Sequence, residues 1–216
     1  SNLRQSSWKT ACLTNFGRLG QAITRYAGDH DGQLPSVPME AGVPWNRIGD
    51  QGNENQSNTR HLWVLIKFGY ASPADFVCPG DRLGSLCIDN SEAMAQLKDF
   101  RCHRNNSYSY QLLCGKTILD TSGNSLLLAD RNPLFENVCS CCNQSDRTIR
   151  IDPQLLAQMS NNHRGRGQNI LRRDGSALFM VDRQIAGDDI YTLKGILLYR
   201  GIEIPCMDGM DNFLAP

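Results

Sequence analysis

The stretch that decides the fold is Cys12–Ala27, CLTNFGRLGQAITRYA, which is followed directly by GDHDGQLP over residues 28–35. Its apolar residues recur at steps of three and four, which places them on one stripe of a helix. Gly28 suits the left-handed residue that follows a helix end, and Pro35 keeps the helix from resuming. The stretch therefore predicts an amphipathic N-terminal helix that ends near Gly28 and buries one face. The stripe consists of Trp8, Cys12, Phe16, Leu19, Ile23 and Tyr26.

A second strong pattern covers residues 162–179, NHRGRGQNILRRDGSALF. Asp174-Gly175 lies between two β-rich runs and predicts a two-residue type I′ hairpin turn, because Asp tolerates positive φ and Gly favours it. Apolar residues fall on both faces of this hairpin, so we expect both faces to be covered, one of them by the N-terminal helix. The pairs predicted by this turn are Arg173 with Ser176, Leu171 with Leu178, and Ile170 with Phe179.

The remaining segments predict a mixed fold in one domain. Residues 107–113 alternate and indicate a strand, and residues 125–130 indicate a second, more buried strand. Short helices are expected over residues 61–70, 89–100 and 153–159, with loops over residues 36–60 and 133–147. The expected organisation is a single domain over 1–216, with an N-terminal helix (1–28), a loop and helix insertion (36–105), an antiparallel sheet region (107–200) and a tail (201–216).

Composition limits the classes of function. The 216 residues include 22 Lys and Arg against 22 Asp and Glu, so the net charge is zero. A balanced chain gives no global argument for nucleic acid or for an anionic membrane surface. The sequence also lacks a run of 18 apolar residues, so the chain as given does not span a bilayer. An amphipathic helix at its very start suggests that a leader or membrane segment upstream has been removed.

Nine cysteines are many for a cytosolic protein of this size. In an oxidising compartment they would form up to four disulfides and leave one thiol. A zinc site that uses Cys139, Cys141 and Cys142 with Cys102 or His103 is an alternative, although this cluster lacks a second C-x2-C pair. Buried free thiols are a third possibility. The disulfide candidates are Cys12, Cys78, Cys87, Cys102, Cys114, Cys139, Cys141, Cys142 and Cys206.

Four pieces of the chain, taken in order, resemble pilin-like proteins, and in particular the pseudopilins of type II secretion systems. The first pieces are Thr10–Ala22 with Tyr26-Ala27 and Asp31–Pro35, then Asp75–Asp81 and the serine-tyrosine strand from Ser107. The final piece is the hairpin, which carries the family motif residues His163, Gly165, Gly167, Asn169, Asp174, Gly175 and Phe179. Four residues of this hairpin depart from the family pattern: Arg172, Arg173, Ser176 and Leu178. These departures weaken any shared ligand-binding role but not the prediction of the hairpin.

The resemblance implies a pilin-like α+β fold, in which a long N-terminal helix packs on a C-terminal antiparallel β-sheet with loop-rich insertions. It further implies a precursor with a prepilin-type leader, subject to cleavage and methylation, and a membrane helix that anchors the chain in the inner membrane. Major pseudopilins bind calcium in a C-terminal loop, which makes Asp208 and Asp211 calcium candidates. No other cofactor is expected.

The function implied by the resemblance is that of a non-catalytic, extracytoplasmic structural subunit, in the periplasm or at the cell surface. Its partners would be other pilin-like subunits and a secretion or pilus assembly apparatus, with no nucleic acid. No residue is assigned a catalytic role, because no nucleophile elbow or metal-hydrolase motif is present in the sequence. Two alternatives remain. One is a ligand-binding module that uses loops 36–60 and 133–147, with carbohydrate as one candidate ligand, and the other is a zinc-binding protein.

Overall fold

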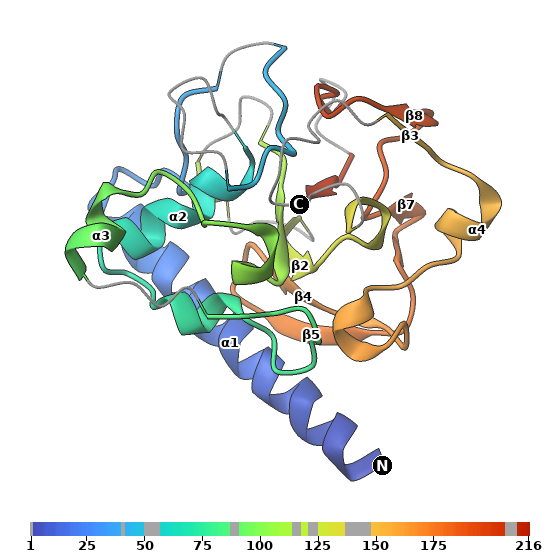
Figure 1. Ribbon diagram of the computed structural model, residues 1–216, viewed down its shortest axis with the longest axis horizontal. Helices are drawn as coiled ribbons and strands as arrows, with labels where there is room; N and C mark the ends of the chain where they lie inside the picture. Colours follow the sequence, from blue (N-terminus) through green and yellow to red (C-terminus); the bar gives the residue numbers. More distant parts are fainter. Residues whose placement is uncertain are drawn as a thin grey trace.

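The computed structural model describes residues 2–39, 42–49, 57–86, 91–113, 118–120, 125–136, 148–205 and 211–216. The fold is mixed α+β, with a long N-terminal helix and a five-stranded antiparallel sheet (Figure 1). The helices are α1 (Asn2–Asp29), α2 (Thr59–Lys67), α3 (Ser91–Gln96) and α4 (Pro153–Leu156), with 3-10 turns η1 (Pro73–Phe76), η2 (His103–Asn105), η3 (Pro133–Phe135) and η4 (Asn161–His163). The strands are β1 (Tyr108–Gln111), β2 (Leu126–Asp130), β3 (Ile149–Arg150), β4 (Gln168–Arg172), β5 (Ala177–Met180), β6 (Gln184–Ile185), β7 (Asp188–Asp189), β8 (Leu198–Tyr199) and β9 (Leu214–Ala215).

The amphipathic stripe predicted for the N-terminal helix is confirmed in α1. Five of its six stripe residues, from Cys12 to Tyr26, are buried, and Trp8 is half-buried. The helix ends at Asp29, one residue later than expected, and Gly28 is helical. The left-handed residues are Asp31 (φ 52°) and Gly32 (φ 78°), and Gly32 N donates to Ala27 O. The chain reverses there because the close approach to Ala27 O requires positive φ after the last helical turn.

The sheet has the strand order β5-β4-β2-β1-β9, and every neighbouring pair is antiparallel. The segment 201–216, expected as a tail, supplies the edge strand β9, which pairs Ala215 with Tyr110. Strand β2 lies in the middle of the sheet, and all of its residues are buried. It is therefore covered on both faces, as its continuous apolar run indicates.

The β4-β5 hairpin forms at Asp174-Gly175, but the predicted register is wrong by one residue. Leu171 pairs with Ala177 and Ile170 pairs with Leu178. Only Gly175 has positive φ (83°), whereas Asp174 does not, so the loop has three residues instead of two. Asp174 Oδ1 accepts from Ser176 N (2.8 Å), which satisfies this turn donor without a second left-handed residue.

The shift in register changes which residues of the two strands share a face, because neighbouring residues of a strand point to opposite sides of a sheet. Leu171 shares its face with Ala177 instead of Leu178. Leu171 faces α1, where its Cδ1 would lie 3.2 Å from a Cβ at Gly20. Ile170 belongs to the other side of the sheet and packs with Leu126 and Phe213. The expectation that α1 covers one face of the hairpin is confirmed, and this face is the one that carries Leu171 and Ala177.

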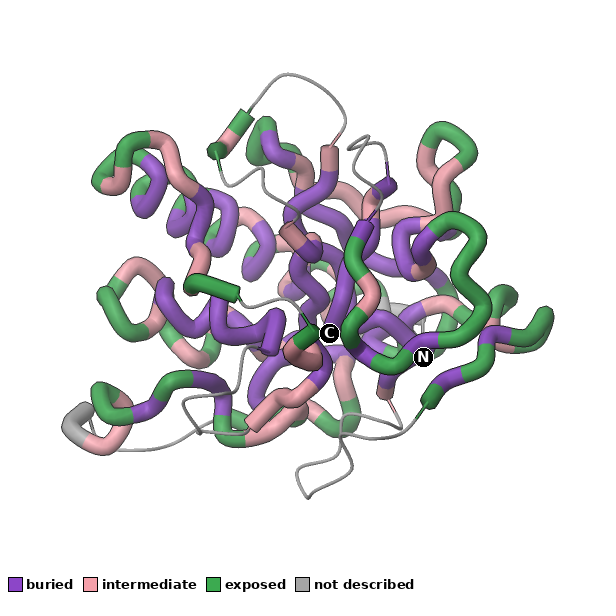
Figure 2. The backbone as a smooth tube through the Cα atoms, turned by 90° about the horizontal axis from the view of Figure 1, so that it is seen from above, coloured by how far each residue is buried: buried purple, intermediate pink, exposed green. Residues whose placement is uncertain are grey.

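Two hydrophobic cores lie on opposite faces of the sheet. The first joins the α1 stripe to α2, β1 and Leu171. The second lies under loops and short strands and contains a cluster of aromatic side chains: Trp45, Phe135, Tyr191, Tyr199 and Phe213. Figure 2 shows the buried segments in the middle of the molecule, with exposed segments on the outer turns. Among the helices that the structure describes, none is both long enough and apolar enough to cross a bilayer.

Candidate functional site

Four side chains from four separate elements meet where α1 crosses the end of β2. Cys12 comes from α1, Cys78 from the loop after η1, Asp130 from the last position of β2, and His163 from η4. Each offers one ligand atom, and these four atoms all lie within 4.8 Å of one another. Cys12 and Asp130 are fully buried, Cys78 is 1% exposed and His163 is 8% exposed. We call these four residues the Cys-Asp-His cluster.

The cluster is held by short contacts around the imidazole and the carboxylate. His163 Nε2 lies 3.2 Å from Asp130 Oδ2 and 3.7 Å from Cys78 Sγ. Cys12 Sγ lies 3.4 Å from Asp130 Oδ1. The side-chain amide of Asn169, a residue of the family motif, lies 2.8 Å from the same imidazole nitrogen. One nitrogen of His163 therefore faces a sulfur, a carboxylate and an amide together.

Asp130 is the central acceptor of the cluster. Its Oδ1 accepts from Asn162 Nδ2 (2.9 Å), and its Oδ2 accepts from the backbone N–H of Asn169 (2.6 Å). A buried carboxylate needs such donors, because water is not present to solvate its charge. These bonds hold the carboxylate against η4 and β4.

The two sulfurs also have fixed polar neighbours. Gly80 N donates to Cys78 Sγ (3.4 Å), and Tyr108 OH lies 3.4 Å from Cys12 Sγ. Gly80 allows this approach because a Cβ there would collide with the carbonyl oxygen of Asn162. The Cys-Pro-Gly-Asp turn is therefore pressed against η4, which brings Cys78 to His163.

The surroundings shift the proton equilibria of the cluster. Burial alone would lower the pKa of His163, but its hydrogen bonds with Asp130 and Cys78 outweigh burial and raise the pKa to about 10. The hydrogen bond from Cys12 lowers the pKa of Cys78 to about 7. Burial raises the pKa of Cys12 well above its usual value. The cluster is thus a place where positive charge is stabilised by a thiolate and a carboxylate.

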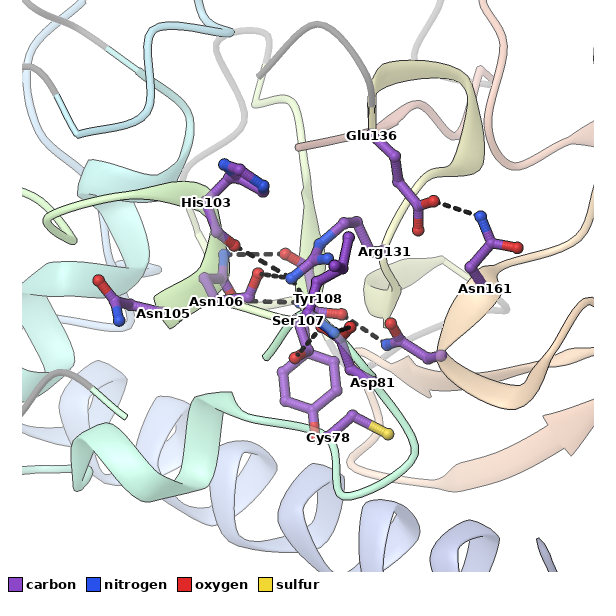
Figure 3. A network of polar contacts seen from close by, with 12 residues as sticks. Cys78, Asp81, His103, Asn105, Asn106, Ser107, Tyr108, Arg131, Glu136 and Asn161 are labelled. Carbon is purple, nitrogen blue, oxygen red and sulfur yellow. Dashed lines mark hydrogen bonds and ion pairs between the residues drawn. The ribbon is translucent and has the colours of Figure 1, made fainter. Parts of the chain in front are cut away.

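A buried ion pair lies beside the cluster. Arg131 follows Asp130 directly, and its NH2 lies 2.8 Å from Asp81 Oδ2 (Figure 3). The same guanidinium nitrogen donates to the carbonyl oxygens of His103 and Asn106 (3.0 and 2.7 Å), and Ser107 Oγ donates to Asp81 (2.7 Å). This network joins the Cys-Pro-Gly-Asp turn to the end of β2, and so supports the position of Cys78 relative to Asp130.

The arrangement does not match a nucleophilic triad. In such a triad one imidazole nitrogen faces the nucleophile, and the other is held by a carboxylate. Here Nε2 of His163 faces both Cys78 and Asp130. Reactive cysteines are also partly exposed as a rule, whereas Cys78 is buried. The geometry suits a role in which all four side chains share one small central partner.

A surface pocket of about 260 Å³ opens on the outer side of His163, next to the first turns of α1. Lys9 Nζ lies 3.7 Å from the centre of the Phe179 ring, and the guanidinium of Arg164 lies 5.2 Å from the ring centre of Trp8. These are cation–π contacts, which hold the basic side chains against the aromatic rings. The pocket is lined by Ser6, Trp8, Lys9, His163, Arg164, Arg166 and Phe179.

The structure brings some of the sequence-predicted residues together and separates others. His163, Asn169 and Phe179 lie around the cluster, and His163 meets the Phe179 ring edge-to-face at 5.6 Å. Gly167 (φ 137°) passes tightly beside Phe179 and the carbonyl oxygen of Met180. Gly165 (φ 69°) is a turn residue in open space, and Asp174 and Gly175 form the hairpin loop.

The expected disulfides are absent at the three cysteines that the described residues include: Cys12, Cys78 and Cys102 are free thiols. Hydrogen-bonding neighbours lie next to each of these sulfurs, and Cys102 Sγ lies 3.5 Å from Asn105 Oδ1. The other disulfide candidates lie outside the described residues: Cys87, Cys114, Cys139, Cys141, Cys142 and Cys206.

The predicted metal sites fall mostly outside the described chain. Asp208 lies there, and Asp211 accepts from Lys194 N (3.0 Å). The proposed zinc ligands Cys139, Cys141 and Cys142 are also outside it.

Sequence reasoning singled out three of the four cluster residues but missed Asp130. It read the run Ser125–Asp130 only as a buried strand. The available signal was a carboxylate at the end of a wholly apolar run, since a buried carboxylate needs partners. Asn162, which donates to Asp130, was likewise read only as part of the motif stretch.

No protein-family model, no curated protein and no solved structure matches this chain.

Proposed function

We propose that this chain is the extracytoplasmic part of a pilin-like structural subunit. In the full-length gene product, a membrane helix would continue α1 toward the inner membrane and anchor the chain there. The subunit would assemble with similar subunits in a type II secretion or pilus-like apparatus. Its role is mechanical, and no reaction is assigned to it.

The observation that carries this proposal is the packing of α1. From Cys12 onward the helix buries one stripe against the sheet, while its first turns extend beyond the body of the molecule (Figure 1). Ser6, Ser7 and Thr10 in these turns are exposed. A helix of 28 residues that is docked from Cys12 onward and projects at its first turns suits a subunit whose projecting part is covered by something else.

The side chains around the projecting turns support a position near a membrane surface. Trp8, Lys9 and Arg164 gather at this end of the molecule, with Phe179 beneath Lys9. Aromatic and basic side chains are favoured at the membrane interface, where the rings lie at headgroup level and the cations face anionic lipid. This local patch exists although the chain as a whole has no net charge.

The alternative of a carbohydrate-binding module is less well supported by the described residues. Sugar sites commonly present aromatic faces in an open cleft. The aromatic residues of the loops 36–60 and 133–147 are Trp45 and Phe135. Both are 1% exposed and form part of the second core. Because they pack against each other, they offer no free ring face to a ligand.

The proposal is tested on the full-length gene product expressed in a bacterial host. Membranes are washed with alkaline carbonate, which releases peripheral proteins and leaves integral ones. A photo-crosslinking amino acid is placed at Ser7 in the projecting turns, with exposed Leu156 of α4 as the matched control position. We expect carbonate-resistant membrane association and a ladder of crosslinked subunits from Ser7, with a weaker ladder from Leu156.

Release of the full-length product by alkaline carbonate would refute the proposal. A single monomer band from Ser7 would also refute it, provided that the same photo-crosslinker forms adducts with a generic protein at high concentration. Neither outcome depends on metal content, so this test is separate from the one that follows.

A further inference from the structure

We infer that Cys12, Cys78, Asp130 and His163 form a structural zinc site that ties α1 to the sheet. The inference rests on the geometry of the Cys-Asp-His cluster and is independent of membrane anchoring. It also differs from the zinc site considered from the sequence, because only the residues of the cluster converge in the described structure.

The first argument is the chemistry of the donors. Two thiols, one imidazole and one carboxylate are all zinc ligands in proteins, and four ligands complete a closed structural site. Sulfur donors favour zinc over calcium or magnesium, which prefer oxygen. The burial of Cys12, Cys78 and Asp130 leaves no open position for water, which also suits a structural ion.

The second argument is distance. Zinc bonds are about 2.3 Å long to sulfur and about 2.0–2.1 Å long to nitrogen or oxygen. In a tetrahedral site, these lengths place a sulfur roughly 3.5 Å from a nitrogen or oxygen ligand, and a nitrogen ligand roughly 3.3 Å from an oxygen ligand. The cluster shows 3.7 Å between Cys78 Sγ and His163 Nε2, and 3.2 Å between His163 Nε2 and Asp130 Oδ2. Cys12 Sγ lies 3.4 Å from Oδ1, the other oxygen of the same carboxylate. With one ligand atom taken from each residue, all four atoms lie within 4.8 Å of one another, so the cluster is compact enough for four ligands to reach one zinc ion.

The third argument is the shell of groups that would hold the ligands in place. Gly80 N donates to Cys78 Sγ, and a backbone N–H directed at sulfur stabilises a thiolate. Asn162 Nδ2 and Asn169 N donate to the carboxylate of Asp130. Metal sites generally have such hydrogen bonds around their ligands, because the ligands must point inward before the ion arrives.

A disulfide between Cys12 and Cys78 is the main competing use of the same atoms. It would bring the two sulfurs to about 2.05 Å and draw both away from the imidazole and the carboxylate. In the structure both thiols are free, and each faces one of these two groups. A disulfide would therefore leave the His163 imidazole and the Asp130 carboxylate without the sulfur that each of them faces.

The consequence of a zinc ion here is mechanical. Its four ligands come from α1, the loop after η1, β2 and η4, which are far apart in the sequence. One ion would therefore replace several weaker contacts in fixing α1 on the sheet. Zinc binding would contribute directly to folding, because the site does not exist in the unfolded chain.

The experiment measures metal on the purified 216-residue chain, prepared without a metal-affinity tag. We expect about one zinc ion per chain. Addition of cobalt(II) to the dialysed protein should give the intense visible bands of a tetrahedral site and the near-ultraviolet charge-transfer band of cobalt bound to thiolate. A chelator should lower the thermal midpoint of the wild-type protein, and zinc, but not magnesium or calcium, should restore it.

The variants C12S and C78S should lose stoichiometric zinc and the thiolate charge-transfer band. C102S is the matched control, because Cys102 is a free thiol outside the cluster, and it should bind as wild type does. It also tests the alternative site, which would use Cys102. Asn162→Ala removes the hydrogen bonds to Asp130 Oδ1 and to the carbonyl oxygen of Ser107 but leaves all four ligands in place. It should weaken zinc binding by about 10- to 100-fold and leave the spectrum tetrahedral.

Three results would overturn the inference. The first is wild-type protein with neither zinc nor a cobalt spectrum. The second is a C12S/C78S double variant that keeps the wild-type spectrum. The third is a Cys12–Cys78 disulfide found by peptide mass mapping in protein supplied with zinc. The chelator experiment needs no substitution, so it decides the matter even if a cysteine variant fails to fold.

Discussion

The packing of α1 on β4 gives a sharp prediction at two glycines of the same helix. Gly17 and Gly20 both lie in the helix interior, where replacing Gly by Ala stabilises a helix by about 1 kcal/mol. A Cβ at Gly17 meets nothing within 4 Å. A Cβ at Gly20 would lie 3.2 Å from Leu171 Cδ1, and Leu171 is fully buried.

We therefore expect Gly17→Ala to raise the free energy of unfolding by about 1 kcal/mol. At Gly20 the same gain is offset by pushing the Leu171 methyl groups into a filled core, so Gly20→Ala should be neutral within about 0.5 kcal/mol. Gly20→Val, which adds two more methyl groups at the contact, should destabilise by roughly 1–3 kcal/mol. Urea denaturation followed by circular dichroism measures all three variants against wild type. Equal stabilisation by both alanines, or a neutral Gly20→Val, would contradict the docking of α1 described above.

Three further perturbations test the interior. Arg131→Met, which leaves the buried Asp81 carboxylate without its ion pair, should cost about 3–5 kcal/mol in chemical denaturation, and adding Asp81→Asn should recover part of the loss. Burial lowers the pKa of His61 from 6.5 to about 4, and its Nδ1 accepts a backbone N–H, so the folded protein favours the neutral imidazole. The stability that this imidazole contributes is therefore present above pH 6.5 and is lost as the pH falls toward 4. At about 1.4 kcal/mol per pH unit, the wild type should lose roughly 3 kcal/mol more than His61→Asn over this interval, and equal losses would contradict the assignment. Gly167 has φ 137°, and a Cβ there would lie 2.8 Å from the Phe179 ring, so Gly167→Ala should destabilise the protein by about 3 kcal/mol or more. Gly165 also has positive φ but lies in open space, so Gly165→Ala should cost only about 1–2 kcal/mol. Thermal denaturation should rank the two variants in this order.

Local signals in the sequence identified the elements well. The stripe from Cys12 to Tyr26 predicted α1 because helical periodicity is a property of a few successive turns. The Asp174-Gly175 turn predicted the hairpin for a similar reason. The predicted register was wrong because it depends on one backbone angle. Asp174 does not have the positive φ of a two-residue turn, so the loop is one residue longer and Leu171 pairs with Ala177 instead of Leu178.

Features that depend on distant partners were not predictable in this way. Strand β9 has only two residues, Leu214–Ala215, which is too short for an alternating pattern, and its strand character comes from pairing with β1. Asp130 became part of a site only because the strand order places the end of β2 beside η4. Cys12, Cys78 and His163 were recognised through a family resemblance, but nothing in their spacing indicated that they converge.

The position of β9 has a consequence for biosynthesis. Strand β1 is flanked on one side by β2 and on the other only by residues 214–215, more than a hundred positions downstream. While the nascent chain emerges from the ribosome, the free edge of β1 stays open until those two residues arrive, and an open edge can pair with another chain. The newly made polypeptide would thus benefit from a chaperone, or from export before it folds, until this late strand closes the sheet.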